Sequence, residues 1–205
     1  MCDGRQTMQA MTPTREQITA GILAGGAGRR LGGIDKGWYV VGERPLIEHT
    51  IARVEPQAAH VVISANRSRR LYGALGWPVV GDADDSYRGP LAGIAQLLQA
   101  VPTPYLLVVP VDTPQLPGDL ADRLAAAMAE DVDLCVARCG GRRQPLHALI
   151  RCERAAGLRE ALAAGVARVV DWQDGLRTRV VDWPDCQAFA NINAPVDARQ
   201  LAGLR

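Results

Sequence analysis

The run YLLVVP at residues 105–110 is the most apolar stretch of the 205-residue sequence. A nearly continuous apolar run of this length is typical of a strand that is buried on both faces of a parallel sheet. Other runs rich in valine and isoleucine occur at residues 18–23, 60–65 and 77–80, and helix-like segments lie between them. Strands that alternate with helices predict an α/β fold whose parallel strands are joined by right-handed crossovers.

The second half of the sequence continues this alternation and adds a hairpin. Residues 134–138 are expected to form a strand, which a Gly-Gly turn joins to a returning strand at residues 145–150. We therefore expect one doubly wound, mostly parallel, Rossmann-like sheet with an antiparallel edge, formed by residues 18–205 as a single domain. Residues 1–17 are polar and contain no apolar segment of the kind found in signal peptides, so we expect a disordered N-terminal tail.

The composition argues against several classes of function. A net charge of +1 gives no electrostatic case for nucleic acid or an anionic membrane as the main partner. No apolar run approaches the ~18 residues that a membrane-spanning helix needs. The five cysteines have no regular spacing, which argues against a disulfide framework and against a zinc site. These features predict a cytoplasmic protein.

Small and polar residues follow the four best predicted strands at the point where each strand ends. The four ends are Ala24-Gly25-Gly26, Ser64-Ala65-Asn66, Gly81-Asp82 and Pro110-Val111-Asp112. Ligands of open parallel sheets bind outside the carboxyl ends of the strands. The sequence therefore predicts a binding site at this edge.

The first of these ends opens a glycine-rich loop, LAGGAGRRLGGIDKGW at residues 23–38, which contains the only lysine of the chain. The loop does not match the dinucleotide-binding pattern GxGxxG, because Leu31 stands at the last glycine position, and it lacks the Gly-Lys-Ser/Thr of a P-loop. Its backbone N–H groups are suited to holding phosphates, with Arg30 and Lys36 to neutralise them. The alternative is a flexible surface loop.

Two further groups of polar residues are candidates for the same site. Asp112 follows the most apolar strand, and a carboxylate there suits Mg²⁺ bound to a substrate phosphate, although an Asp-x-Pro turn or a helix cap is the alternative. Asp82 lies in an acidic run, where solvation alone is an adequate explanation. Asn191 and Asn193 share one face by alternation and suit recognition of a heterocycle, with helix capping as the alternative.

The segment LAGGAGRRLGGIDKG resembles the signature of the molybdenum cofactor guanylyltransferases, which have the sugar-nucleotidyltransferase-like fold. The resemblance extends over residues 19–201 in order, through the segments ISANR, VVGDADDSYRGPLAG, VPVDTPQLP, QPLHALI, GVARVVDW and FANINAP. The form LAGG, in place of LAAG, is associated with the guanine-using members over their cytidylyltransferase relatives.

Members of this family join GMP from GTP to the terminal phosphate of molybdopterin, release pyrophosphate and use Mg²⁺. The resemblance implies GTP contacts at Leu23, Ala24, Gly25, Gly26, Lys36, Ser64 and Asp82, of which Ser64 departs from the family's asparagine. It further implies a phosphate-handling Arg30, Mg²⁺ at Asp112, and pterin contacts at Asn191 and Asn193.

The predicted chemistry fits the residues, because a phosphate acceptor is already anionic and requires no general base. Arg30, Lys36 and Mg²⁺ on Asp112 would then act by positioning and by charge stabilisation. The alternatives are a related cytidylyltransferase or another pyrophosphorylase of the same fold, and a non-catalytic nucleotide-binding module. We also expect transient contacts with other proteins of molybdenum cofactor biosynthesis and with acceptor molybdoenzymes.

Overall fold

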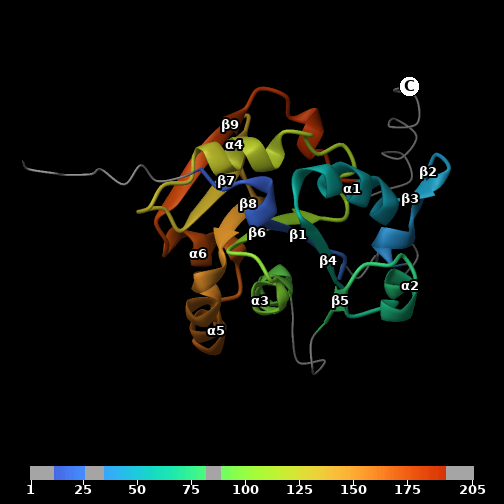
Figure 1. The fold of residues 1–205 in the computed structure, drawn as a ribbon, viewed down its shortest axis with the longest axis horizontal. Helices are drawn as coiled ribbons and strands as arrows, with labels where there is room; N and C mark the ends of the chain where they lie inside the picture. The colour runs from blue at the N-terminus through green and yellow to red at the C-terminus, as the bar shows by residue number, and fades with distance from the viewer. Residues whose placement is uncertain (1–11, 26–34, 82–88, 193–205) are drawn as a thin grey trace, which may run out of the picture.

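The computed structural model describes residues 12–25, 35–81 and 89–192. Seven strands form one sheet in the order β5-β4-β1-β6-β8-β7-β9 (Figure 1). Their bounds are β1 Ile18–Leu23, β4 His60–Ser64, β5 Val79–Val80, β6 Tyr105–Pro110, β7 Leu134–Cys139, β8 Arg142–Arg151 and β9 Thr178–Trp183. β1 pairs in parallel with β4 and β6, β4 with β5, and β7 with β9. The predicted α/β fold with a mostly parallel sheet is confirmed.

The antiparallel strand lies inside the sheet. β8 pairs antiparallel with β6 on one side and with β7 on the other, and β9 forms the outer edge. The sequence analysis placed the antiparallel strand at the edge of the sheet, and this position is wrong. The reason is burial. Residues 147–150 of β8 are all buried, whereas β9 is mostly half-buried or exposed and can therefore occupy the edge of the sheet.

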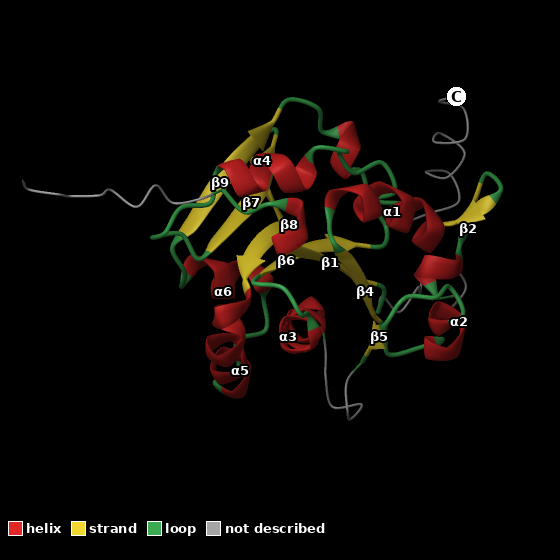
Figure 2. Cartoon of the chain, viewed as in Figure 1, coloured by secondary structure: helices red, strands yellow, loops and turns green. Residues whose placement is uncertain are grey.

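Helices cover both faces of the sheet (Figures 1 and 2). The helices are α1 Leu46–Val54, α2 Arg69–Gly73, α3 Pro90–Ala100, α4 Leu120–Ala126, α5 Ala155–Ala163 and α6 Val169–Asp174. One core cluster contains apolar residues of α1 and α4, and the other contains those of α3, α5 and α6. Along β6, Leu107 and Val109 belong to the first cluster and Leu106 and Val108 to the second. β6 is thus the doubly buried strand that its sequence predicts.

Short elements complete the described chain. A small ribbon pairs β2 Val40–Val41 with β3 Arg44–Pro45, and Pro45 directly precedes α1. The 3₁₀ helices are η1 Arg15–Gln17, η3 Lys36–Trp38, η4 Glu55–Gln57, η5 Cys152–Arg154 and η6 Gln187–Phe189. η1 lies within residues 1–17, the segment that was expected to be a disordered tail. Residues 1–11 of that segment, and residues 193–205 at the other end of the chain, lie outside the described residues.

The structure joins Cys139 to Cys186 in a disulfide, with their Cα atoms 5.5 Å apart. This corrects the interpretation of the cysteine spacing. The two residues are 47 positions apart in sequence, and they meet because the end of β7 lies beside the end of β9 and the chain that follows it. Only the sheet order brings them together.

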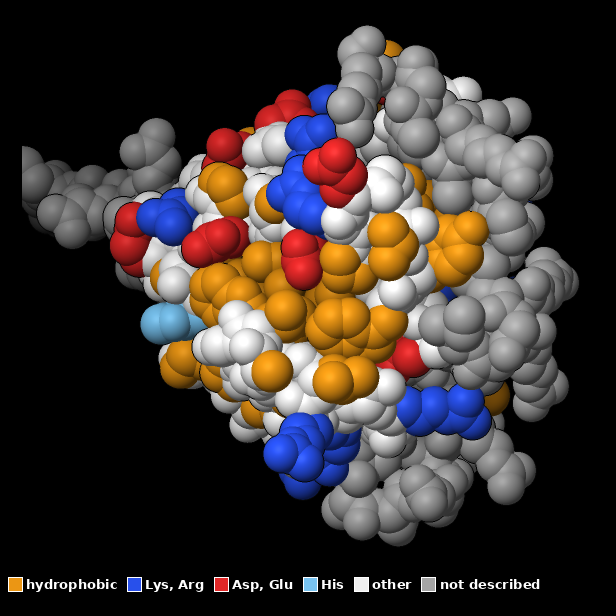
Figure 3. Space-filling view, turned by 90° about the vertical axis from the view of Figure 1, so that its right-hand side faces the viewer, with side chains coloured by type: hydrophobic (Ala, Val, Ile, Leu, Met, Phe, Trp, Pro, Cys, Tyr) orange, Lys and Arg blue, Asp and Glu red, His pale blue; other side chains and the backbone are white. Residues whose placement is uncertain are grey.

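Within the described ranges, no helix is long and apolar enough to cross a membrane. On the side that lies at the right of Figure 1, hydrophobic side chains form a continuous area with charged side chains around it (Figure 3). β2 and α2 lie on this side and carry Val40 and Leu71, the most exposed large hydrophobic residues that the structure describes.

Candidate active site

A cleft of about 700 Å³ opens at the carboxyl ends of β1, β4 and β6. The ends are level because Leu23 of β1 is in register with Ser64 of β4 on one side and with Pro110 of β6 on the other. Two backbone hydrogen bonds continue past the strands, from Ala24 N to Ser64 O (2.8 Å) and from Val111 N to Leu23 O (3.1 Å). The floor of the cleft is therefore part of the sheet and is rigid.

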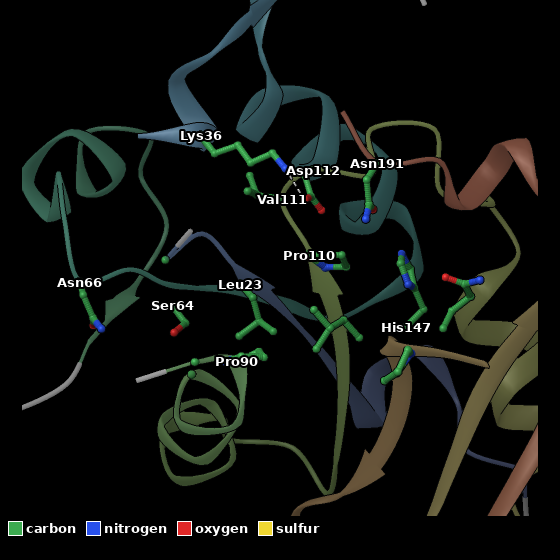
Figure 4. Close-up of a pocket in the computed structure, with 16 residues that line it drawn as sticks. Leu23, Lys36, Ser64, Asn66, Pro90, Pro110, Val111, Asp112, His147 and Asn191 are labelled. Atoms are coloured by element: carbon green, nitrogen blue, oxygen red, sulfur yellow. Dashed lines mark hydrogen bonds and ion pairs between the residues drawn. The ribbon is translucent and has the colours of Figure 1, made fainter. Parts of the chain in front are cut away.

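An ion pair crosses the cleft. The Nζ atom of Lys36 lies 2.6 Å from Oδ2 of Asp112, and the two side chains are 14% and 19% exposed (Figure 4). Asp112 follows β6, whereas Lys36 opens the 3₁₀ turn η3, which Asp35 caps through a bond from Gly37 N to Asp35 Oδ1 (3.3 Å). Two residues that are 76 positions apart thus meet at one point, ready to engage a charged ligand.

The backbone that carries Asp112 is held from two sides. The hydroxyl of Thr50 on α1 donates to the carbonyl oxygen of Val111 (3.1 Å), and Ile192 N donates to the carbonyl oxygen of Asp112 (2.9 Å). The second bond also brings the neighbouring Asn191 into the cleft, where it lies beside Asp112 (Figure 4). The chain after η6 is therefore a wall of the site.

The adjoining wall comes from β8, in a segment that the sequence analysis did not assign to the site. Gln144, Pro145, Leu146 and His147 line the cleft. His147 Nε2 and the hydroxyl of Thr113 lie 3.0 Å apart, and the His147 ring packs edge-on against Phe189 at 5.0 Å. Burial lowers the pKa of His147 to about 3, so this imidazole is neutral at ordinary pH. The motif QPLHALI resembles the family, but no residue type in it predicts which side chains would face a ligand.

α3 closes the cleft from below. Gly89, Pro90 and Gly93, at the start of this helix, line it. A Cβ on Gly93 would lie 2.7 Å from a side-chain carbon of Leu23 and 3.0 Å from the hydroxyl of Ser64. Only glycine allows the first turn of α3 to lie this close to the strand ends.

The structure brings most of the described candidate residues together. The candidates that line the cleft are Leu23, Gly25, Lys36, Ser64, Asp112 and Asn191. Ala24 is 2% exposed and is absent from the lining of the cleft, and its N–H continues the sheet by donating to Ser64 O. Gly26, Arg30, Asp82 and Asn193 lie outside the described residues.

The described residues contain no group of three or more His, Cys, Asp or Glu side chains that could hold a metal ion by themselves. A cation that is shared with a nucleotide's phosphates needs fewer protein ligands, and Mg²⁺ commonly takes one or two carboxylates. Asp112, which is partly exposed and faces the cleft, fits that role.

Comparison with known proteins agrees with this geometry. The model of the MobA-like NTP transferase domain matches residues 20–177. A molybdenum cofactor guanylyltransferase of Shewanella loihica is 41% identical over 188 residues, which cover 91% of this chain and 96% of the relative. One of Ralstonia nicotianae is 42% identical over 205 residues, which cover 95% of this chain and all of the relative.

Solved structures show the same fold at lower identity. The crystal structure of molybdopterin-guanine dinucleotide biosynthesis protein A from Archaeoglobus fulgidus has a TM-score of 0.75 at 20% identity, covering 91% of this chain and 97% of that one. A nucleotidyl transferase from Methanothermobacter thermautotrophicus has a TM-score of 0.72 at 19% identity, covering 91% and 96%. By its sequence and its fold, the chain belongs to the MobA-like NTP transferase family, among the molybdenum cofactor guanylyltransferases, and is a nucleotidyltransferase.

Proposed function

We propose that the protein transfers GMP from GTP to the terminal phosphate of molybdopterin, which forms the guanine dinucleotide cofactor and releases pyrophosphate. The observation that carries this proposal is the pair of Lys36 and Asp112, 2.6 Å apart at the carboxyl end of β6 in the cleft. One cation and one carboxylate at this place can engage a triphosphate and its divalent cation together. The name of the relatives supports guanine as the base.

The reaction needs positioning more than proton transfer. The acceptor phosphate is already an anion, so displacement at the α-phosphate of GTP proceeds without a general base. His147 fits this account, because its low pKa and its contact with Thr113 leave it unsuited to accept a proton from a substrate. We assign His147 to the wall of the cleft.

Lys36 would neutralise phosphate oxygens, and the start of α3, which lines the same cleft, would add the positive end of a helix dipole. Asp112 would hold Mg²⁺, which supplies charge stabilisation to the phosphates when it is bound. Arg30, which the family resemblance implies as a phosphate-handling residue, and Asp82 belong to the same proposal.

The cleft has two sides, and each suits one substrate. Leu23, Gly25 and Ser64 lie on the side of β1 and β4, where we place GTP together with Ala24 and Gly26. Asn191 lies on the side of β8, where we place molybdopterin, with Asn193 as a further contact. Contacts with other cofactor-biosynthesis proteins and with acceptor molybdoenzymes, and a cytoplasmic location, remain predictions from the sequence.

The direct test measures pyrophosphate release with molybdopterin as acceptor and with GTP, CTP or ATP as donor. We expect release with GTP and Mg²⁺, and at least ~10-fold less with the other nucleotides, since a base-reading site discriminates by more than ~1.4 kcal/mol. Faster turnover with CTP would favour the cytidylyltransferase alternative, and tight GTP binding without turnover would favour the non-catalytic module.

The matched variant for this test is Asp112→Asn, which removes one charge and keeps the shape of the side chain. We expect it to abolish transfer while the protein stays folded, because the carboxylate that would hold the cation is lost. Asp119→Asn is the control, since Asp119 is 57% exposed and its partner is Arg123, outside the cleft. Near-normal turnover of Asp112→Asn at saturating Mg²⁺ would contradict the role given to Asp112.

A further inference from the structure

Tyr72 is a buried tyrosine that the sequence analysis did not assign to the site. It lies on α2, with no exposed surface, and its hydroxyl donates to Oδ1 of Asp35 at 2.6 Å. Its ring packs against Trp38 with the ring centroids 5.2 Å apart. Asp35 caps the turn η3, which begins with Lys36 and ends with Trp38, so one buried side chain contacts this turn at both ends.

Asp35 organises that turn from within. Its Oδ1, which accepts from Tyr72, also accepts from Gly37 N at 3.3 Å, and its carbonyl oxygen accepts from Trp38 N at 2.9 Å. The other carboxylate oxygen, Oδ2, is buried and has no hydrogen-bond partner among the described residues. A buried carboxylate with so few partners depends strongly on each of them.

At Gly37, the contact between the turn η3 and Tyr72 is steric as well as polar. A Cβ added to Gly37 would collide with the hydroxyl oxygen of Tyr72, and its next neighbours, also of Tyr72, are ring carbons at 3.1 and 3.2 Å. Gly37 has no positive φ, so alanine would suit its backbone, and the main obstacle to a methyl group here is the hydroxyl of Tyr72. Burial and the neighbouring Asp35 raise the pKa of Tyr72, so the hydroxyl keeps its proton and remains a donor.

We infer that Tyr72 is a positioning residue for Lys36: through Asp35 and Gly37, its hydroxyl fixes the turn η3 and so directs the ammonium group into the cleft at Asp112. Lys36 follows the cap Asp35 directly and precedes Gly37, so a rotation of the turn displaces its side chain. Displacement of a catalytic group by as little as ~1 Å can cost on the order of 100-fold in rate. The kinetic part of this inference rests on the proposed function, whereas the position of Lys36 does not.

The first test compares Tyr72→Phe with Tyr105→Phe. Both variants delete one buried hydroxyl with a hydrogen-bond partner, but Tyr105 is at the opposite end of β6, where its hydroxyl accepts from Arg151. We expect Tyr72→Phe to lower kcat by ~10-fold with little change in the KM for GTP, because Lys36 acts on the phosphates as they gain charge. Tyr105→Phe should keep the parental kcat.

The second test uses Gly37→Ala, with and without Tyr72→Phe. Gly37→Ala should lose activity because its methyl group displaces either the hydroxyl or the turn. In that background Tyr72→Phe should raise kcat, the reverse of its effect in the parent, because the colliding oxygen is gone. If Tyr72→Phe lowers kcat equally in both backgrounds, or in neither, the inference is wrong.

A third readout does not require activity. Because Lys36 is the only lysine of the chain, lysine-selective ¹³C labelling gives NMR signals from this residue alone. We expect Tyr72→Phe to shift and narrow the Cε signal, and Tyr105→Phe to leave it unchanged. Should Tyr72→Phe fail to fold, Asp35→Asn and Asp35→Ala take its place, since asparagine can still accept from the hydroxyl and should keep the parental signal where alanine should not.

These results distinguish a failure of the proposed function from a failure of the positioning role. If the parent shows no transfer but Tyr72→Phe changes the Lys36 signal, the proposed function fails and the positioning role stands. If transfer is normal and neither kcat nor the signal responds to Tyr72→Phe, the positioning role is excluded and the proposed function remains.

Discussion

Lys36 is the only lysine among 23 basic residues, and its ammonium group lies within 2.6 Å of a carboxylate in the cleft. An ammonium group is a compact point charge, whereas a guanidinium group is planar, bulkier and suited to bidentate contacts. A chain that uses arginine almost everywhere else therefore keeps a lysine at the position where a single ammonium group contacts Asp112. The composition by itself already points to the chemistry of this single position.

We predict that Lys36→Arg loses at least ~10-fold in turnover, which corresponds to ~1.4 kcal/mol of transition-state stabilisation. The charge remains but its donors are misplaced relative to the phosphates. Lys36→Ala should lose more. Steady-state kinetics with GTP and molybdopterin measures both effects, and Arg138→Lys serves as the control, because Arg138 pairs with Asp182 on an exposed part of β7. An arginine variant as active as the parent would show that the lone lysine has no catalytic significance.

Asn191 supports a prediction for the acceptor. It lines the cleft beside Asp112, on a segment that Ile192 N ties to the carbonyl oxygen of that residue. Asn191→Ala should therefore raise the KM for molybdopterin by several-fold and the KM for GTP much less, since the amide is lost only on the side of β8. A lower melting temperature with both KM values unchanged would instead indicate a structural role for the amide.

Among the elements, β8 does most to shape the cleft. Its pairing with β7 jumps from Val136↔Ala148 to Ala137↔Gln144, so residues 145–147 leave the ladder. Pro145 has no N–H to donate, and its carbonyl oxygen accepts from Gln173 on α6 at 2.8 Å. The irregularity, typical of sites next to a ligand, turns this part of the strand toward the cleft.

The disulfide links two other elements, the end of β7 and the start of η6, which leads to Asn191. A bridge across 47 positions restricts the unfolded chain, and its loss is expected to lower the free energy of unfolding by about 4 kcal/mol. We predict that Cys186→Ser, or reduction of the parent, lowers the melting temperature by several degrees.

Cys152→Ser is the control for this prediction, because Cys152 is a free cysteine. Thiol titration of the denatured, non-reduced protein should find two fewer thiols than the five cysteines of the sequence. A count of five in a protein with the parental melting temperature would show that the bond does not form under those conditions.

At the scale of the whole molecule, one sheet with a core on each face holds the site together. Thr50 of α1 and His147 of β8 contact the two neighbours of Asp112, and Phe189 of η6 packs against His147. Stability and site geometry therefore share the same buried contacts. His147 makes the link between stability and site geometry measurable, because it is a buried titratable group in contact with Thr113, next to Asp112.

We predict that the protein loses stability as the pH falls from 7 to 5, in part through His147. Its folded pKa of about 3 lies below the ordinary value of 6.5, so the unfolded chain binds a proton that the folded chain excludes. The contribution of the neutral, buried His147 to the free energy of unfolding is complete above pH ~6.5. It declines below that pH, by about 2 kcal/mol at pH 5.

Denaturant unfolding at pH 7 and pH 5 measures this loss. His147→Gln, whose amide can still reach the hydroxyl of Thr113, should show a smaller difference between the two pH values. His60→Gln is the control, because His60 is exposed at the start of β4. An identical pH dependence in all three proteins would mean that His147 does not contribute.

Much of the fold is predictable from the sequence because burial and periodicity are local signals. The doubly buried β6, the alternation of strands with helices, and the convergence of the strand ends follow from apolar runs and turn residues. Leu23, Gly25, Ser64 and Asp112 reach one cleft because parallel strands place their carboxyl ends at the same edge.

What the sequence alone determined is the class of the fold, the edge of the sheet at which the cleft opens and the candidate residues at each strand end. The tertiary structure decided which distant residues meet: Lys36 with Asp112, Cys139 with Cys186, Tyr72 with Asp35, and His147 with Thr113. It also decided that β8 lies inside the sheet, against the expected edge. The physical reason is that strand order arises from the packing of the entire core, and no local pattern of residues encodes it.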